Sequence, residues 1–123
     1  MKKMLLLAAV VEAATGLALM VAPSLVARLL LGVELTGVSI PVARVAGIGL
    51  FSLGLACWPV KQTSRTAPRA LLIYNMLITL YLGYIGLKGE LVGLLLWPAV
   101  VLHAVLTVLL GKMWFKLQED TRA

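Results

Sequence analysis

Three ionisable side chains, Glu12, Arg44 and His103, interrupt the long apolar runs of this sequence and are its main candidates for chemistry. Charged groups are costly to place in the hydrocarbon of a bilayer, so ionisable residues within apolar segments usually mark a functional site. A carboxyl group, a guanidinium group and an imidazole together can bind a proton, an ion or a small polar metabolite. We interpret these residues as the candidate site, and Asn75 as a further hydrogen-bonding member.

Small residues surround Glu12 on its own predicted helix. Ala8, Ala9, Thr15 and Gly16 lie three or four residues away, so another helix can approach this face closely. The pattern predicts a carboxyl group that points into the bundle, ~13 Å into the membrane by helix rise. The alternative is a structural carboxyl group, protonated or paired, that only fixes helix packing.

Helix geometry gives Glu12 two candidate partners. Arg44 would form an ion pair if its side chain bridged a depth difference of roughly 9 Å; alternatively, it snorkels to the headgroups. His103 lies at a depth close to that of Glu12, where it either exchanges protons or only hydrogen-bonds across helices. Interhelical hydrogen bonding is also the simplest role for Asn75. Haem ligation by His103 would need a second chain.

Several recognised catalytic and binding motifs are missing from the sequence. It contains no phosphate-binding glycine-rich loop, no HExxH and no GxSxG. The single cysteine, Cys57, rules out an intrachain disulfide and fits a small apolar position in a helix. We therefore expect no cofactor and no metal, and we favour a function other than catalysis.

The composition places the chain in a membrane. Hydrophobic residues make up 62% of its 123 residues, charged residues only 13%, and the mean hydropathy is +1.04. A soluble domain usually has about a quarter charged residues. The net charge of +6 comes from basic residues that flank apolar runs, which indicates contact with lipid headgroups and not with nucleic acid.

Four apolar runs, at about 4–22, 40–60, 70–87 and 91–111, predict an all-α bundle of four transmembrane helices in a single membrane domain. Each run is close to the ~20 residues that a helix needs to cross the hydrocarbon core. The segment from Pro23 to Gly32 predicts a short interfacial helix between the first two spans, because proline suits a first helical position and glycine a C-terminal cap. The aromatic residues, Tyr74 among them, fit belts at the two membrane surfaces.

The basic residues predict the orientation. Eight lie on one side of the four-span arrangement and three on the other, which places both termini in the cytoplasm. The eight are Lys2, Lys3, Lys61, Arg65, Arg69, Lys112, Lys116 and Arg122. We expect the first run to be an uncleaved span and not a signal peptide, because Glu12 interrupts it.

A set of small residues on the second predicted span, Ala43, Gly47, Gly49 and Gly54, suits close helix packing. Besides the lipid bilayer, we therefore expect a second copy of the chain or another membrane protein as a partner.

Several short segments together resemble a known group of proteins. These segments are Glu12-x3-Gly16, Pro23, Leu30-Leu31-Gly32, Ala43-Arg44-Val45-Ala46-Gly47, Tyr74-Asn75 and Leu96-Trp97-Pro98-Ala99-Val100-Val101-Leu102-His103. The chain is similar to small bacterial membrane proteins that are broadly DoxX-like. The resemblance implies four helices in the inner membrane, and it implies no particular reaction.

Two functions remain open from the sequence. In the first, Glu12, Arg44, His103 and Asn75 form a site that binds or transports a proton, an ion or a small metabolite. In the second, the chain is a structural or accessory subunit of a membrane complex, and its polar residues only fix helix packing. A redox role with a quinone or haem is a more distant alternative.

The predicted topology can be tested with fusions. A reporter fused after Ala123 is expected to report the cytoplasm, and one inserted near Lys88 the periplasm, because basic loops stay inside. Alkaline phosphatase and green fluorescent protein activities measure the two locations. Both reporters on one side, or the reverse pattern, would contradict four spans in this orientation.

Overall fold

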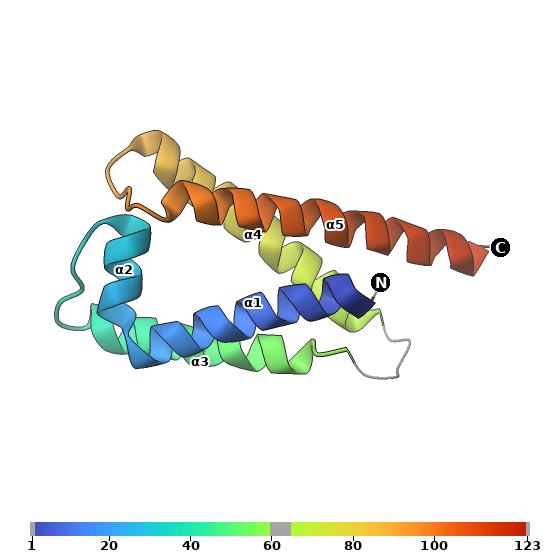
Figure 1. The fold of residues 1–123 in the computed structure, drawn as a ribbon, viewed down its shortest axis with the longest axis horizontal. Coiled ribbons are helices and arrows are strands. Elements are labelled where there is room, and N and C mark those ends of the chain that lie inside the picture. Colours follow the sequence, from blue (N-terminus) through green and yellow to red (C-terminus); the bar gives the residue numbers. More distant parts are fainter. Residues whose placement is uncertain (1, 60–64, 123) are drawn as a thin grey trace.

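The computed structural model describes residues 2–59 and 65–122, and within these ranges the chain is helical without a strand. Figure 1 shows its arrangement. The helices are α1 (Lys2–Val21), α2 (Pro23–Leu31), α3 (Ser39–Ala56), α4 (Thr66–Lys88) and α5 (Leu96–Arg122). All except α2 are long and apolar enough to cross a membrane. The predicted fold, four spans with a short helix between the first two, is confirmed.

The short helix has the ends that the sequence predicted. Pro23 occupies its first turn, and Gly32 caps its C-terminus in the left-handed conformation, with φ of 71°. The Gly32 amide donates to the Arg28 carbonyl oxygen at 3.0 Å. Figure 1 shows α2 running across the ends of the long helices.

All four spans differ from the predicted bounds, and the first, Lys2–Val21 against 4–22, differs by no more than two residues at either end. The second ends at Ala56, and residue 60 of its predicted range lies outside the described residues. The third begins at Thr66 and not at 70, and the fourth runs from Leu96 to Arg122 and not from 91 to 111. Hydropathy marks the apolar part of a helix, whereas a helix continues into polar sequence as long as its backbone bonds are made.

Helices α1 and α3 form a tight antiparallel pair built on glycine. A Cβ atom added to Gly16 would lie 2.6 Å from the Gly47 carbonyl oxygen, and one added to Gly54 would lie 2.7 Å from the Ala9 carbonyl oxygen. No side chain fits at these positions, so the two backbones touch directly, as at small-residue interfaces between membrane helices. Gly47 and Gly54 are thus buried against α1 and do not offer the free packing face that we expected for a second copy.

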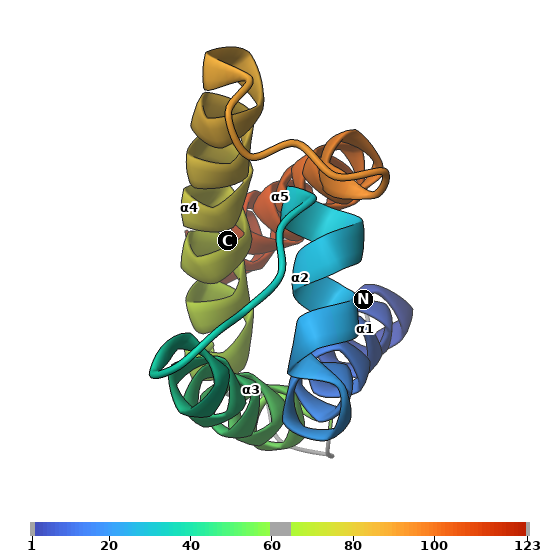
Figure 2. The ribbon, with the colours of Figure 1, turned by 90° about the vertical axis from the view of Figure 1, so that its left-hand side faces the viewer.

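Helices α4 and α5 form the second pair, and one end of α1 packs against it. Figures 1 and 2 show α4 starting beside the α1–α3 pair and diverging from α3 along its length. The two pairs meet around an apolar cluster, Ala8, Cys57, Leu71, Leu106, Leu110 and Met113. Cys57 is a buried free thiol in this cluster, as expected for a small apolar position.

At the opposite end, α2 joins the two pairs through backbone hydrogen bonds. The amides of Gly93 and Leu95, in the loop before α5, donate to the carbonyl oxygens of Leu30 and Leu29 at 3.0 and 2.7 Å. These carbonyl groups, at the end of α2, have no partner within the helix. Because these two hydrogen bonds hold the loop against the end of α2, the apolar residues 91–95 form a loop and do not begin the fourth span.

The glycine contact gives a prediction about stability. Gly16→Ala is expected to lower the free energy of unfolding by about 1–3 kcal/mol, because the added methyl group must push two backbones apart. Unfolding in mixed detergent micelles, followed by circular dichroism, measures the change. Gly49→Ala is the matched control, because a Cβ there meets no atom within 4 Å, and alanine favours a helix over glycine by about 1 kcal/mol. Equal effects of the two changes would contradict the close α1–α3 contact.

Candidate functional site

Three buried polar side chains from three helices converge where the two helix pairs meet. Glu12 of α1 and Asn75 of α4 are each 0% exposed, and His103 of α5 is 8% exposed. The three are the buried polar or charged residues within the described ranges. The structure therefore brings together three of the four residues that the sequence indicated.

The position of Glu12 on α1 follows from the packing of its neighbours. Ala9, Ala13 and Gly16 lie against α3, whereas Ala8 belongs to the apolar cluster shared with α4 and α5. Glu12 lies one helical turn after Ala8, on the same flank. The α1–α3 contact thus turns the carboxyl group toward the second helix pair, as the ring of small neighbours predicted.

Asn75 and His103 form a hydrogen bond between α4 and α5. Asn75 Nδ2 donates to the Leu71 carbonyl oxygen at 2.8 Å, one turn earlier in the same helix. This bond fixes the orientation of the amide, so Asn75 Oδ1 is the atom that lies 2.7 Å from His103 Nδ1. An amide oxygen only accepts, so His103 carries its proton on Nδ1. In the neutral ring, Nε2 is then the free base.

Glu12 has no such partner. Both of its carboxyl oxygens are buried, and neither makes a hydrogen bond to a described residue. The ion-pair neighbour of Glu12 among the described residues is His103, whose Nδ1 lies 3.9 Å from Glu12 Oε1. This is within ion-pair range but beyond hydrogen-bond length. Most buried polar atoms in proteins are hydrogen-bonded, so an unsatisfied carboxyl group at this depth stands apart from ordinary packing.

Tyr74 is a fourth member of the site that the sequence did not indicate. Its ring packs edge-on against His103, with centroids 6.3 Å apart and planes at 77°. Its hydroxyl group also interacts with the Glu12 carboxyl group. We expected Tyr74 in an aromatic belt at the membrane surface. The sequence did contain one signal for the inward position of Tyr74. It is next to Asn75 and one helical turn after Leu71, and both of these residues lie on the inward side of α4.

Arg44 lies outside the site. It is exposed on α3, and it does not pair with Glu12, whose only ion-pair neighbour among the described residues is His103. The antiparallel register of α1 and α3 explains the difference. Gly54 lies beside Ala9 and Ala13, so Arg44 is displaced from the level of Glu12 by about 15 Å along the helix. This gap exceeds the predicted separation and the reach of an arginine side chain.

Hydroxyl groups near the site are satisfied within their own helices. Thr79 donates to the carbonyl oxygen of Asn75 and Thr107 to that of His103, both at 2.7 Å. Such bonds to the preceding turn leave these hydroxyl groups without further hydrogens to donate. Within the described part of the chain, no cluster of three or more His, Cys, Asp or Glu side chains could hold a metal ion.

Comparisons of the chain with protein-family models, with curated proteins and with solved structures give no match. The argument for function therefore depends on the geometry of the site.

The hydrogen bond between Asn75 and His103 can be tested with a double-mutant cycle. Asn75→Leu and His103→Phe are expected to be coupled by about 1 kcal/mol in the free energy of unfolding, because each removes the same interhelical bond. Unfolding of the two single variants and the double variant in mixed micelles measures the coupling. As a control, Arg44→Gln and His103→Phe should be additive. Additive losses for Asn75 and His103 would reject the bond.

Proposed function

We propose that this protein is a small inner-membrane protein whose Glu12–His103–Asn75 cluster binds and releases a proton within the bilayer. The observation that supports this proposal is the fully buried Glu12 carboxyl group without a hydrogen-bond partner, 3.9 Å from an imidazole. The proposal includes the predicted orientation with both termini in the cytoplasm. In its support, α1 begins and α5 ends at the same end of the molecule (Figure 1).

The surroundings of Glu12 favour states in which the site is uncharged overall. An isolated carboxylate in an apolar medium is very costly. Glu12 is therefore either a neutral acid beside a neutral His103 or a carboxylate beside an imidazolium ion. These two states hold the same number of protons and differ only in which residue carries one of them. Release of a proton leaves the Glu12 carboxylate beside a neutral His103, and a rise in pH populates this state.

Asn75 prepares the imidazole for this exchange. Its bond to Nδ1 holds the ring in one tautomer and directs the basic lone pair to Nε2. The bond also remains favourable when the ring gains a second proton, because both nitrogens are donors in the imidazolium ion. The ring nitrogen near Glu12 is Nδ1, at 3.9 Å from Oε1. A movement of about 1 Å would let a Glu12 carboxylate accept a hydrogen bond from Nδ1, which also donates to Asn75, while the added proton of the imidazolium ion lies on Nε2.

A proton fits this site better than the other ligands that the sequence left open. A hard metal cation takes about six or more oxygen ligands, whereas this site offers two carboxyl oxygens and an amide oxygen that His103 already occupies. A small charged metabolite would need compensating charges. Apart from the Tyr74 phenol, the ionisable groups of the cluster are Glu12 and His103, which balance each other.

The competing function is that of a structural subunit, in which the same residues only lock the helices. The interhelical Asn75–His103 bond favours this alternative, because such bonds stabilise helix packing without any ligand. The two functions differ in what Glu12 does: a packing residue keeps one protonation state, whereas a proton-exchange site changes it with pH.

Infrared difference spectroscopy of the protein in lipid vesicles separates the two. We expect a carboxylic acid C=O band that weakens as pH rises, shifts in heavy water and is absent from Glu12→Gln, while the melting temperature of that variant changes little. Glu34→Gln is the matched control, because Glu34 is an exposed carboxylate paired with Arg28. A Glu12 band that stays constant across the pH range in which the protein is folded would reject proton exchange.

A further inference from the structure

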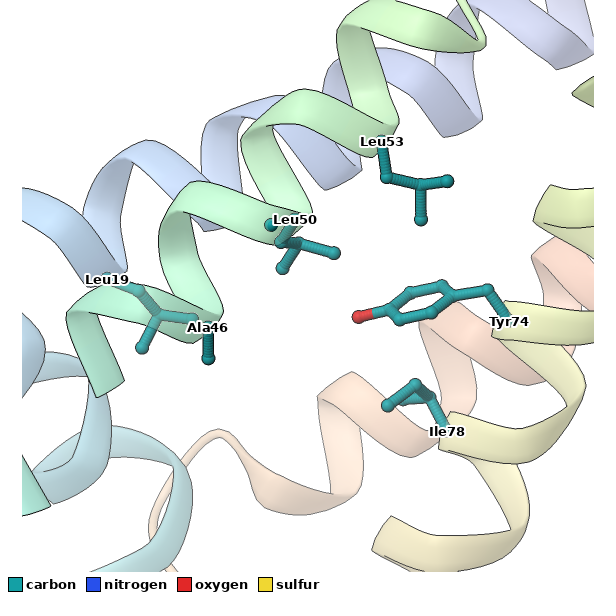
Figure 3. A pocket seen from close by; sticks show the side chains of 7 residues that line it. Leu19, Ala46, Leu50, Leu53, Tyr74 and Ile78 are labelled. Atoms are coloured by element: carbon teal, nitrogen blue, oxygen red, sulfur yellow. The ribbon is translucent and has the colours of Figure 1, made fainter. Parts of the chain in front are cut away.

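A cleft of about 550 Å³ opens between α3 and α4, with one residue of α1 at its edge. Figure 3 shows side chains that line it, including Ala46, Leu50, Leu53, Tyr74 and Ile78. Its volume lies within the range of roughly 300–1,000 Å³ that is typical of sites for small molecules. Its lining is aliphatic except for one polar group, the hydroxyl of Tyr74.

Two features keep this space open. Helix α4 diverges from α3 along its length (Figures 1 and 2), and two of the four α3 residues that line the gap, Ala46 and Gly49, are small. A Cβ atom at Gly49 would meet no atom within 4 Å. Gly49 therefore differs from Gly47 and Gly54, where the α1 backbone occupies the space that a side chain would need.

Tyr74 connects the cleft to the buried cluster. Figure 3 shows its hydroxyl group directed away from α4 toward α3, inside the cleft. The same side chain packs its ring against His103 and interacts electrostatically with Glu12. A molecule that hydrogen-bonds to this hydroxyl group would thus lie one side chain away from the proton-exchange cluster.

We infer that the cleft binds an uncharged, lipid-soluble amphiphile, a molecule with an apolar chain or ring and a single hydroxyl or carbonyl oxygen that hydrogen-bonds to Tyr74. The aliphatic lining matches the apolar body, and the one polar group matches the one oxygen. A fatty acid anion fits poorly, because no cation lines the cleft and the one polar group of the lining, the Tyr74 hydroxyl, already interacts with the Glu12 carboxyl group. A phospholipid headgroup would place charges against aliphatic side chains, which is costly.

This inference goes beyond proton exchange and stands on the lining of the cleft itself. Glu12 is not part of the lining, so the volume and lining of the cleft do not depend on its protonation. A failed infrared test would therefore reject the proton site without affecting the cleft, and the reverse also holds.

The experiment uses the whole protein in phospholipid vesicles and a dodecanol that carries a photoreactive diazirine in its chain. After illumination and digestion, mass spectrometry locates the labelled residues. We expect saturable labelling of the α3 and α4 segments around Leu50, Leu53 and Ile78, and competition by unlabelled dodecanol. Labelling that grows linearly with probe and covers all lipid-facing helix surfaces equally would overturn the proposal.

Two variants test the fit. Gly49→Leu fills the open space and is expected to reduce the saturable labelling at least tenfold, whereas Gly83→Leu, on α4 outside the cleft and also without a neighbour within 4 Å of its Cβ, should leave it unchanged. Tyr74→Phe keeps the ring but removes the hydroxyl group, and it is expected to weaken binding about fivefold, the equivalent of one hydrogen bond of ~1 kcal/mol.

The outcomes of these variants are distinct. Thermal unfolding of each variant shows whether it folds. If Gly49→Leu does not fold, Tyr74→Phe still tests the site. Unchanged labelling of both variants would overturn the site. A phosphatidylcholine with a diazirine in its acyl chain is the last comparison: equal labelling of the cleft by this lipid, without competition by dodecanol, would assign the cleft to bulk lipid and reject the amphiphile.

Discussion

The direct contact between the backbones of α1 and α3 is the constraint on which the arrangement of this protein depends. Glycine at positions 16, 47 and 54 lets the backbones of the two helices come into direct contact at these points. Lipid tails are as apolar as leucine, so membrane helices gain little from hiding apolar surface and associate instead through close packing. With one flank of α1 committed to α3, its next flank, which carries Glu12, faces the α4–α5 pair.

The bilayer sets the second condition, because it offers buried polar groups no water. The described helices satisfy most of their polar side chains within the same helix. The hydroxyl groups of Ser52, Thr79 and Thr107 donate to the carbonyl oxygen one turn earlier, and the Asn75 amide group does the same with one of its two hydrogens. The loop amides of Gly93 and Leu95 complete the end of α2. The two carboxyl oxygens of Glu12, which have no hydrogen-bond partner among the described residues, are the exception to this pattern. A buried polar group without a partner is a position where a function is expected.

Tyr74 gives the proposed proton site and the proposed ligand cleft a common side chain. It lies between an aliphatic space that faces α3 and a polar cluster shared by α1, α4 and α5. An amphiphile that hydrogen-bonds to Tyr74 would therefore lie one side chain away from Glu12 and His103. The two proposals remain separate in their evidence, because the cleft is defined by volume and lining and the cluster by burial and missing hydrogen bonds.

Some features of the fold could be predicted because they are local in the chain. Apolar run length determined the four spans, and Pro23 and Gly32 marked the ends of the short helix, since helix ends depend on a few neighbouring residues. Small neighbours within one turn predicted that Glu12 points inward. Counting residues along the spans also placed His103 at the depth of Glu12, because helix rise is constant.

Other features were decided only by contacts between helices. The register of α1 against α3 separates Arg44 from Glu12, and it follows from which glycines meet. The start of the last span at Leu96 depends on two loop amides that bond to α2, and the inward position of Tyr74 and the cleft beside it depend on how α4 diverges from α3. Rotation, register and crossing of helices arise from side-chain packing between segments far apart in sequence, so hydropathy and spacing along one chain do not contain them.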